Sequence, residues 1–212
     1  MEFRNGTLSV LVPTRLPLLG GAPFDLEIRV PSDSACEVVT ASADVRCTGQ
    51  LGRLKSRSAS GDLDADVING PVVVNTASGD VMLRDITGPL RVHSASGGVM
   101  AERAGDEVTV RTASGDVRIE DARASVRARS SSGDVRIGAV SSGRAEITTM
   151  SGDIAVGVAA GIDLYLDLSA LSGQVRSELE PSGHDGGVTL TLLCHSVSGD
   201  VLVSRATEAQ AR

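Results

Sequence analysis

The chain has 212 residues, of which 41% are hydrophobic and 1% aromatic, and its formal net charge at pH 7 is −7. No run of about 18 apolar residues occurs, so neither a transmembrane helix nor direct membrane insertion is expected. The first 20 residues do not resemble a secretory signal peptide, and we expect a cytoplasmic protein. Net negative charge and scarce aromatics argue against a nucleic-acid partner, which needs a concentrated basic face and stacking side chains.

The first predicted elements form an N-terminal cap over residues 1–38. Alternating apolar residues predict one strand before the Pro- and Gly-rich link 13–23 and another after it. The apolar residues of these two strands are Leu8, Val10, Val12, Leu26, Ile28 and Val30.

The following segment, residues 39–204, is a repeat built on the tripeptide Ser-Gly-Asp or a near copy of it. The serines of the copies are Ser60, Ser78, Ser96, Ser114, Ser132, Ser151, Ser172 and Ser198. The first four spacings are 18 residues each and the later ones are 19, 21 and 26. A degenerate copy at Ser42 lies one period before the first. A fixed period of this kind indicates a repeat architecture.

Two short segments of alternating apolar and polar residues flank each serine, which is the pattern of half-buried strands. The residue three positions after the serine is always apolar: Val45, Leu63, Val81, Val99, Val117, Val135, Ile154, Val175 and Val201. Two strands per 18 residues predict an all-β fold, a parallel β-solenoid of about nine coils stabilised by stacking of neighbours. A left-handed hexapeptide helix, as in acyltransferases, does not fit, because six-residue steps from Val81 reach Thr87 and His93.

The Thr-Ala-Ser-Gly-Asp-Val register at residues 76–81 and 112–117 resembles a bacterial adhesin-like repeat domain of unknown function, also called the toastrack domain. Residues 24–31 resemble the lead-in strand of that family, and the resemblance covers about residues 24–204. It implies a single-stranded right-handed β-helix that serves as an assembly or interaction platform, in some relatives tied to envelope-stress systems. The family supplies no catalytic residues.

The aspartates of the repeat predict a ladder of stacked carboxylates. They are Asp44, Asp62, Asp80, Asp116, Asp134, Asp153 and Asp200. Gly98 and Gln174 interrupt the ladder. We expect a structural role, with Gly at a positive-φ turn position and Asp bonding to the turn backbone. The alternative is a calcium-binding module like a β-roll, but the nonapeptide glycines are missing and one Asp per coil supplies few of the oxygens that calcium needs.

The remaining candidate residues carry weaker patterns. Cys36, Cys47 and Cys194 replace apolar core residues and are expected to be buried and inert. His93 and His195 fall in an outward column with Arg111 and Arg129. His184 and Asp185 lie in the insert 177–187, a loop that is a candidate binding element. No metal, cofactor or small-molecule substrate is expected.

We therefore predict a non-catalytic scaffold, an adhesin-like protein-interaction module that is not an enzyme. A polysaccharide-active β-helix enzyme is a further alternative, although minimal coils leave little to build a groove. Because only the polar tail 205–212 follows the last repeat, the C-terminal coil is the predicted association surface, for self-pairing or a protein partner. The residues expected there are Val201, Val203 and Leu179 of the insert.

Overall fold

The computed structural model describes residues 2–4, 6–11, 25–179 and 189–206, in two compact units, 1–30 and 31–212. The first unit contains β1 (Glu2–Arg4) and β2 (Thr7–Ser9), which pair antiparallel around Gly6. Of the predicted cap residues, Leu8, Leu26, Ile28 and Val30 are partly exposed, with relative accessibilities of 37–51%. Val12 and the link 13–23 lie outside the described residues, so the capping role stays a prediction.

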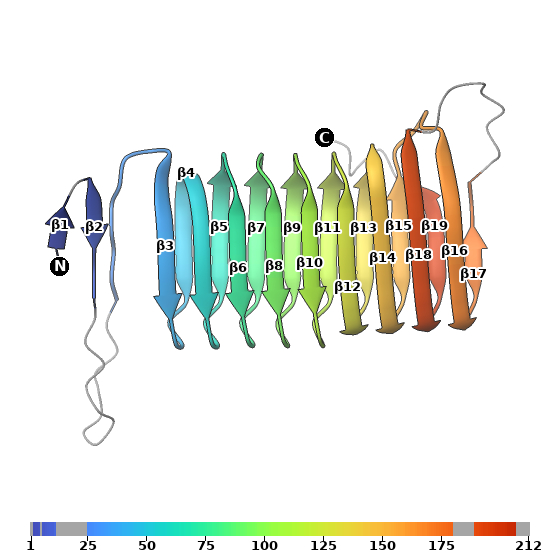
Figure 1. The fold of residues 1–212 in the computed structure, drawn as a ribbon, viewed down its shortest axis with the longest axis horizontal. Helices are drawn as coiled ribbons and strands as arrows, with labels where there is room; N and C mark the ends of the chain where they lie inside the picture. Colours follow the sequence, from blue (N-terminus) through green and yellow to red (C-terminus); the bar gives the residue numbers. More distant parts are fainter. Residues whose placement is uncertain (1, 5, 12–24, 180–188, 207–212) are drawn as a thin grey trace, which may run out of the picture. The chain divides into compact units, whose positions relative to one another are not determined.

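The second unit is the predicted parallel β-solenoid, whose 17 strands form two ladders (Figure 1). The first ladder contains, in spatial order, β3 (Ser34–Thr40), the second half of β4 (Val45–Ser58), β6 (Val72–Thr76), β8 (Leu90–Ser94), β10 (Val108–Thr112), β12 (Val126–Ser132), β14 (Gly143–Ser151), β18 (Leu190–Ser198) and β16 (Leu164–Ser172). The second contains the first half of β4, β5 (Leu63–Ile68), β7 (Val81–Ile86), β9 (Val99–Ala104), β11 (Val117–Ala122), β13 (Val135–Val140), β15 (Ile154–Val158), β19 (Val201–Arg205) and β17 (Val175–Ser177). The described residues contain no helix, and hence none that could cross a membrane.

The apolar columns of the repeat form the core between the two ladders. Val110 on β10 pairs in register with Val92 on β8 and Ala128 on β12, and all three side chains are fully buried. Val, Leu, Ile and Ala make up nearly the whole core, with the buried Cys194 among them. The solenoid begins at Ser34, because β3 already pairs with β4 inside the segment that was expected to belong to the cap.

The last two levels of the solenoid depart from chain order. About seven turns, from β3 to β15, stack in the order of the sequence. The chain then forms β16 and β17 and returns to insert β18 and β19 between them and the β14–β15 level (Figure 1). The predicted run of about nine coils in chain order is therefore too long.

The C-terminal coil lies inside the solenoid and not at its end, where it was expected, whereas association through this coil stays a prediction. Val201 and Val203 on β19 pair with β15 on one side and β17 on the other, and both are buried. Among the described strands the level at this end is that of β16 and β17, where Leu171 is 85% exposed and Val175 is 43% exposed. Leu179 is half-buried against the core rather than free on a projecting loop.

The glycine of each Ser-Gly-Asp turn is required by the close approach of successive coils. A Cβ atom at Gly97 would lie 1.9 Å from the carbonyl oxygen of Gly79, and the equivalent glycines show contacts of 2.0–2.4 Å. A positive φ, which we expected throughout, occurs in the repeat turns only at Gly152, Gly173 and Gly199. The earlier copies use glycine because no side chain fits between the turns.

Candidate interaction surfaces

The aspartates of the repeat turns bond to the backbone of the next coil. Asp44 Oδ1 accepts the Asp62 N–H at 3.0 Å, and Asp62 Oδ1 accepts the Asp80 N–H at 2.9 Å. The ladder follows the spatial order of the coils, because Asp153 accepts from Asp200, and Asp200 accepts from Gln174, both at 2.8 Å. Each carboxylate thus satisfies a turn N–H that has no partner in its own strand.

Gly98 leaves a gap in this ladder that a substitution can fill. Asp80 Oδ1 accepts the Gly98 N–H at 2.8 Å, but Gly98 has no side chain to accept the N–H of Asp116 on the next coil. A Cβ at Gly98 would meet nothing closer than 3.4 Å and its φ is not positive. We expect Gly98→Asn to raise the unfolding free energy by about 1 kcal/mol, from one new hydrogen bond and lower unfolded-state entropy. Thermal unfolding measures this gain in stability. A midpoint of Gly98→Asn that is equal to or lower than that of the unsubstituted protein would contradict the prediction.

The alternative role of the carboxylate ladder is calcium binding. At most one carboxylate projects from each turn, and within the described residues no group of three or more His, Cys, Asp or Glu side chains is placed to hold a metal ion. Calcium needs six to eight oxygen ligands. We expect the thermal midpoint to be the same in excess calcium and in chelator. A rise of many degrees with calcium would instead favour the β-roll alternative.

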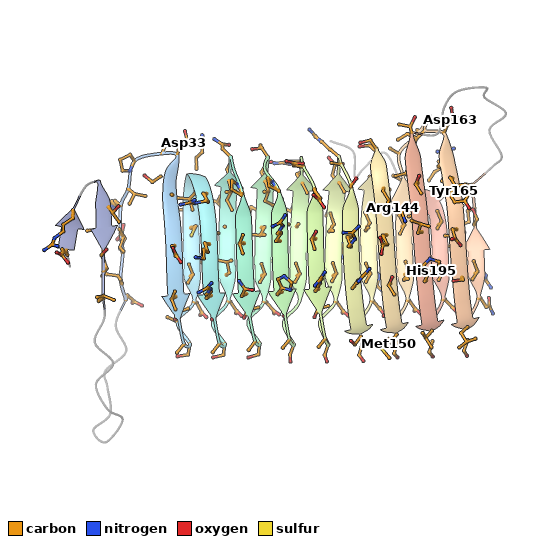
Figure 2. The ribbon with its side chains drawn as sticks, viewed as in Figure 1. Asp33, Arg144, Met150, Asp163, Tyr165 and His195 are labelled. Carbon is orange, nitrogen blue, oxygen red and sulfur yellow. The ribbon has the colours of Figure 1, made fainter. Side chains whose placement is uncertain are left out.

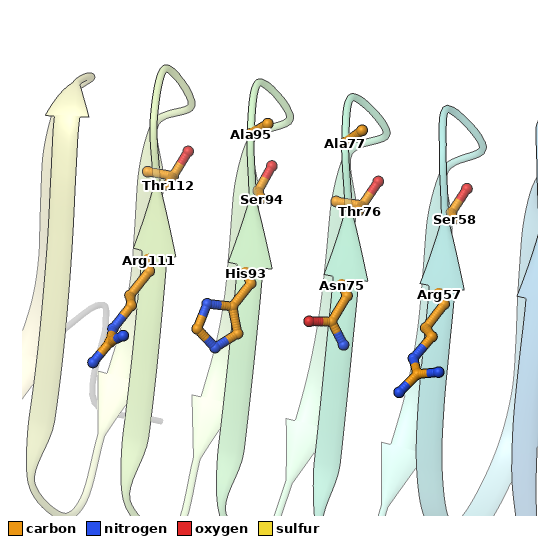
Figure 3. A pocket seen from close by; sticks show the side chains of 10 residues that line it. All are labelled: Arg57, Ser58, Asn75, Thr76, Ala77, His93, Ser94, Ala95, Arg111 and Thr112. Atoms are coloured by element: carbon orange, nitrogen blue, oxygen red, sulfur yellow. The ribbon is translucent and has the colours of Figure 1, made fainter.

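The first ladder carries a basic face on its solvent side. Along β4, β6, β8, β10 and β12 the outward strand positions contain no carboxylate. The cationic and titratable side chains there, which we call the basic face, are Arg53, Lys55, Arg57, Arg91, His93, Arg111, Arg127 and Arg129. A shallow open depression lies on this face, where Arg57, Asn75, His93 and Arg111 occupy one column on successive strands (Figure 3).

The centre of the basic face is not neutralised. Lys55 pairs with Glu37 on β3, and Arg127 and Arg129 pair with Glu146 on β14, so the carboxylates lie only at the two borders. The hydrogen bond from Arg129 and the charge of Arg127 lower the pKa of Glu146 from its usual value, although burial opposes the shift. Arg57, Arg91 and Arg111 make no ion pair with any described residue. These three guanidinium groups therefore face solvent outside any ion pair, although the charge of Glu37 still acts on Arg57.

The outward face of the second ladder is different, because its cations from β4 to β13 are paired with carboxylates. Arg84 bonds to Asp64 and Asp66, and Arg103 bonds to Asp85 at 3.0 Å. Arg118 pairs with Glu120, and Arg136 pairs with Asp134 at 2.9 Å. An opposing charge near each of these arginines offsets its positive charge. The two faces of the solenoid thus differ in electrostatics although they share one core.

The histidines are placed on the outward side of the first ladder. His93 is exposed and lines the depression, whereas His195 on β18 is half-buried, with Nδ1 at 2.7 Å from the Ser169 hydroxyl of β16. Figure 2 shows His195 and Tyr165 on these neighbouring strands. The depression contains one titratable base, His93, and no carboxylate among its lining residues. It thus lacks the paired carboxylates that glycoside hydrolysis requires. His184 and Asp185, the candidate binding pair of the insert, lie outside the described residues.

The three cysteines do not share one environment. Cys194 is fully buried, and burial raises the pKa of its thiol to about 12, as expected for an inert core residue. Cys36 and Cys47 are only half-buried, so the prediction that they are buried is wrong for these two. They lie in the first level of the solenoid, which among the described strands has a neighbouring level on one side.

The model of the Toastrack family, described as Toastrack DUF4097, matches residues 5–212. The match covers nearly the whole chain and includes the solenoid and the turns described above. No curated protein and no solved structure gives a match. The chain therefore belongs to the Toastrack family, a family that carries no assigned activity.

Proposed function

We propose that this member of the Toastrack family is a non-catalytic scaffold, an adhesin-like module that binds an acidic segment of a protein partner across its basic face. The observation that carries the proposal is the group of unpaired arginines, Arg57, Arg91 and Arg111, on a face without carboxylates. Such a face concentrates positive potential although the chain as a whole has a net charge of −7. It favours binding of negative charge and steers its approach.

The dimensions of the basic face suit a short extended segment. From β4 to β12 there are four inter-strand steps, which at about 4.8 Å each make roughly 19 Å. Extended polypeptide advances about 3.3 Å per residue, so about six residues cover this length. A hexapeptide rich in Glu or Asp would place its carboxylates opposite the guanidinium groups.

A protein segment is favoured over a nucleic acid by two features. Within the described residues of the solenoid the one Phe, Tyr or Trp is Tyr165 on β16, outside the basic face, so no such ring is available there to stack on bases. The acidic remainder of the chain repels a long polyanion that extends beyond the basic face. The family resemblance suggests an adhesin-like assembly or an envelope-stress system as the setting, and a cytoplasmic location remains a prediction.

The test is fluorescence anisotropy with a labelled hexaglutamate peptide, with a hexalysine peptide as the charge control. We expect the solenoid to bind hexaglutamate with an affinity that falls as the salt concentration rises, and we expect no binding of hexalysine. The triple variant Arg57→Ser, Arg91→Ser, Arg111→Ser should lose tenfold or more in affinity.

A matched triple variant on the other face controls for net charge. Arg46→Ser, Arg118→Ser and Arg136→Ser remove the same number of cations from the second ladder, where each pairs with a carboxylate. We expect this variant to keep most of its affinity for hexaglutamate. Equal losses in the two triple variants, or no binding by the unsubstituted protein at low salt, would overturn the proposal.

A further inference from the structure

Two cysteines meet in the first level of the solenoid. Cys36 on β3 and Cys47 on β4 lie on either side of the turn at residues 41–44. Cys36 is in register with the core residue Leu54, and Cys47 with the core residue Ala65. Both side chains therefore point inward from opposite ladders, and both pack against the core. The two thiols face each other across one level.

The two thiols are close enough to shift each other's pKa. The neighbouring Cys47 thiol lowers the pKa of Cys36 to about 7, although burial opposes the shift. The neighbouring Cys36 thiol, followed by burial, raises the pKa of Cys47. This asymmetry matches a nucleophilic and a resolving cysteine.

Access distinguishes this pair from the third cysteine. Among the described strands β3 pairs with β4 alone, and both Cys36 and Cys47 are half-buried. Cys194 is enclosed between the levels of β14 and β16, with no exposed surface. Cys36 and Cys47 thus keep part of their surface exposed, whereas Cys194 becomes accessible only by local unfolding. The edge position of β3 also allows the small movement that a sulfur–sulfur bond of about 2 Å requires.

We propose that Cys36 and Cys47 form a redox-active dithiol site that reacts with small-molecule disulfides of the glutathione type. The Cys36 thiolate attacks one sulfur of the disulfide, forming a mixed disulfide and releasing one thiolate. Cys47 then gives its proton to that thiolate and attacks the Cys36 sulfur, forming the Cys36–Cys47 bond and releasing a second thiolate, which takes up a proton from solvent. The two protein thiols are oxidised and the small-molecule disulfide is reduced to two thiols.

The Cys36–Cys47 disulfide would link β3, the first strand of the described solenoid, covalently to β4. In the reduced protein, β3 is held by its ladder bonds to β4 and can separate from β4 at low cost. A disulfide that closes a loop of about ten residues restricts this separation. The site thereby couples the redox state to the order of the solenoid's first level, independently of the basic face.

The experiment treats the full chain with glutathione disulfide and maps the products by peptide mass spectrometry. We expect the peptides containing Cys36 and Cys47 to be joined with the loss of two hydrogens, while Cys194 stays a free thiol in the folded protein. Hydrogen exchange of the β3 amides should slow tenfold or more on oxidation and recover with a dithiol reductant. Cys194→Ala is the matched control and should leave both results unchanged.

The single variants separate the two steps. Cys47→Ser should stop at a stable mixed disulfide on Cys36, whereas Cys36→Ser should react more slowly than the unsubstituted protein. Mapping of the unsubstituted protein needs no variant, so a poorly folded variant does not obscure the result. Free Cys36 and Cys47 after prolonged treatment, linkage to Cys194, or unchanged β3 exchange on oxidation would overturn the proposal.

Discussion

Val110→Asp is expected to lower the unfolding free energy by about 3–5 kcal/mol or to prevent folding, because it buries an unpaired carboxylate. Val110 is fully buried between Val92 and Ala128 of the adjacent coils, and no cation reaches this part of the core. Arg111, one residue later, is exposed on the basic face, and Arg111→Asp should change the unfolding free energy by less than about 0.5 kcal/mol.

Chemical denaturation of the two variants measures this difference. The register of β10 in the first ladder determines which of the two neighbouring residues faces the core. Equal tolerance at positions 110 and 111 would mean that the strand is shifted by one residue, since such a shift exchanges the inner and outer faces.

Gly97→Ala is the second substitution with a large expected effect, about 3 kcal/mol of destabilisation. The added Cβ would lie 1.9 Å from the Gly79 carbonyl oxygen of the preceding coil, and both atoms belong to backbone that adjoining strands hold in place. The coils must separate locally to admit it, which weakens the hydrogen bonds of the turn and the packing next to it. The effect arises from contact between coils rather than from backbone strain.

The neighbouring glycine supplies the control. Gly98→Ala places a Cβ 3.4 Å from Asp80 Oδ1, an ordinary contact, and should change the stability by less than about 1 kcal/mol. Thermal unfolding of the two variants, monitored by circular dichroism, gives the comparison. A Gly97→Ala protein as stable as Gly98→Ala would show that the turns are not stacked as closely as described.

The regular part of the fold could be predicted from the sequence because the constant period of the repeat determines which residues of successive coils lie in register. Equal spacing of 18 residues from Ser60 to Ser132 places every core position above its equivalent, as the register of Val81 with Val99 shows. The polar positions between them alternate strictly, so the inner and outer faces of each strand follow directly.

The order of the last levels could not be predicted in the same way. Leu166 on β16 and Leu192 on β18 occupy the same core column, so either strand offers β14 an apolar surface. The longer spacings of 21 and 26 residues show that the regular winding ends, but they do not say which strand lies next to β14. That choice depends on long-range pairing and on packing of the whole level.

The basic face could not be predicted from the average composition, but it can be found in the sequence when the outward positions of the repeats are aligned. A net charge of −7 argues against a concentrated basic surface, because the carboxylates of the turns and of the second ladder dominate the sum. Aligning the outward positions at the period of the repeat brings Arg57, His93 and Arg111 into one column. On the first ladder, the strands between β3, which carries Glu37, and β14, which carries Glu146, have no carboxylate at their outward positions. This becomes visible only when both outward columns of that ladder are compared.

Photo-crosslinking locates the bound partner most directly. A hexaglutamate peptide with a photoreactive group at one end would be bound at low salt, irradiated and mapped by mass spectrometry. We expect the crosslinks on the outward residues of β6, β8 and β10, including Asn75 and Thr109, and we expect them to disappear in the variant that lacks Arg57, Arg91 and Arg111. Crosslinks concentrated on Tyr165, Leu171 or Val175 would instead assign binding to the level of β16 and β17 and contradict the role of the basic face.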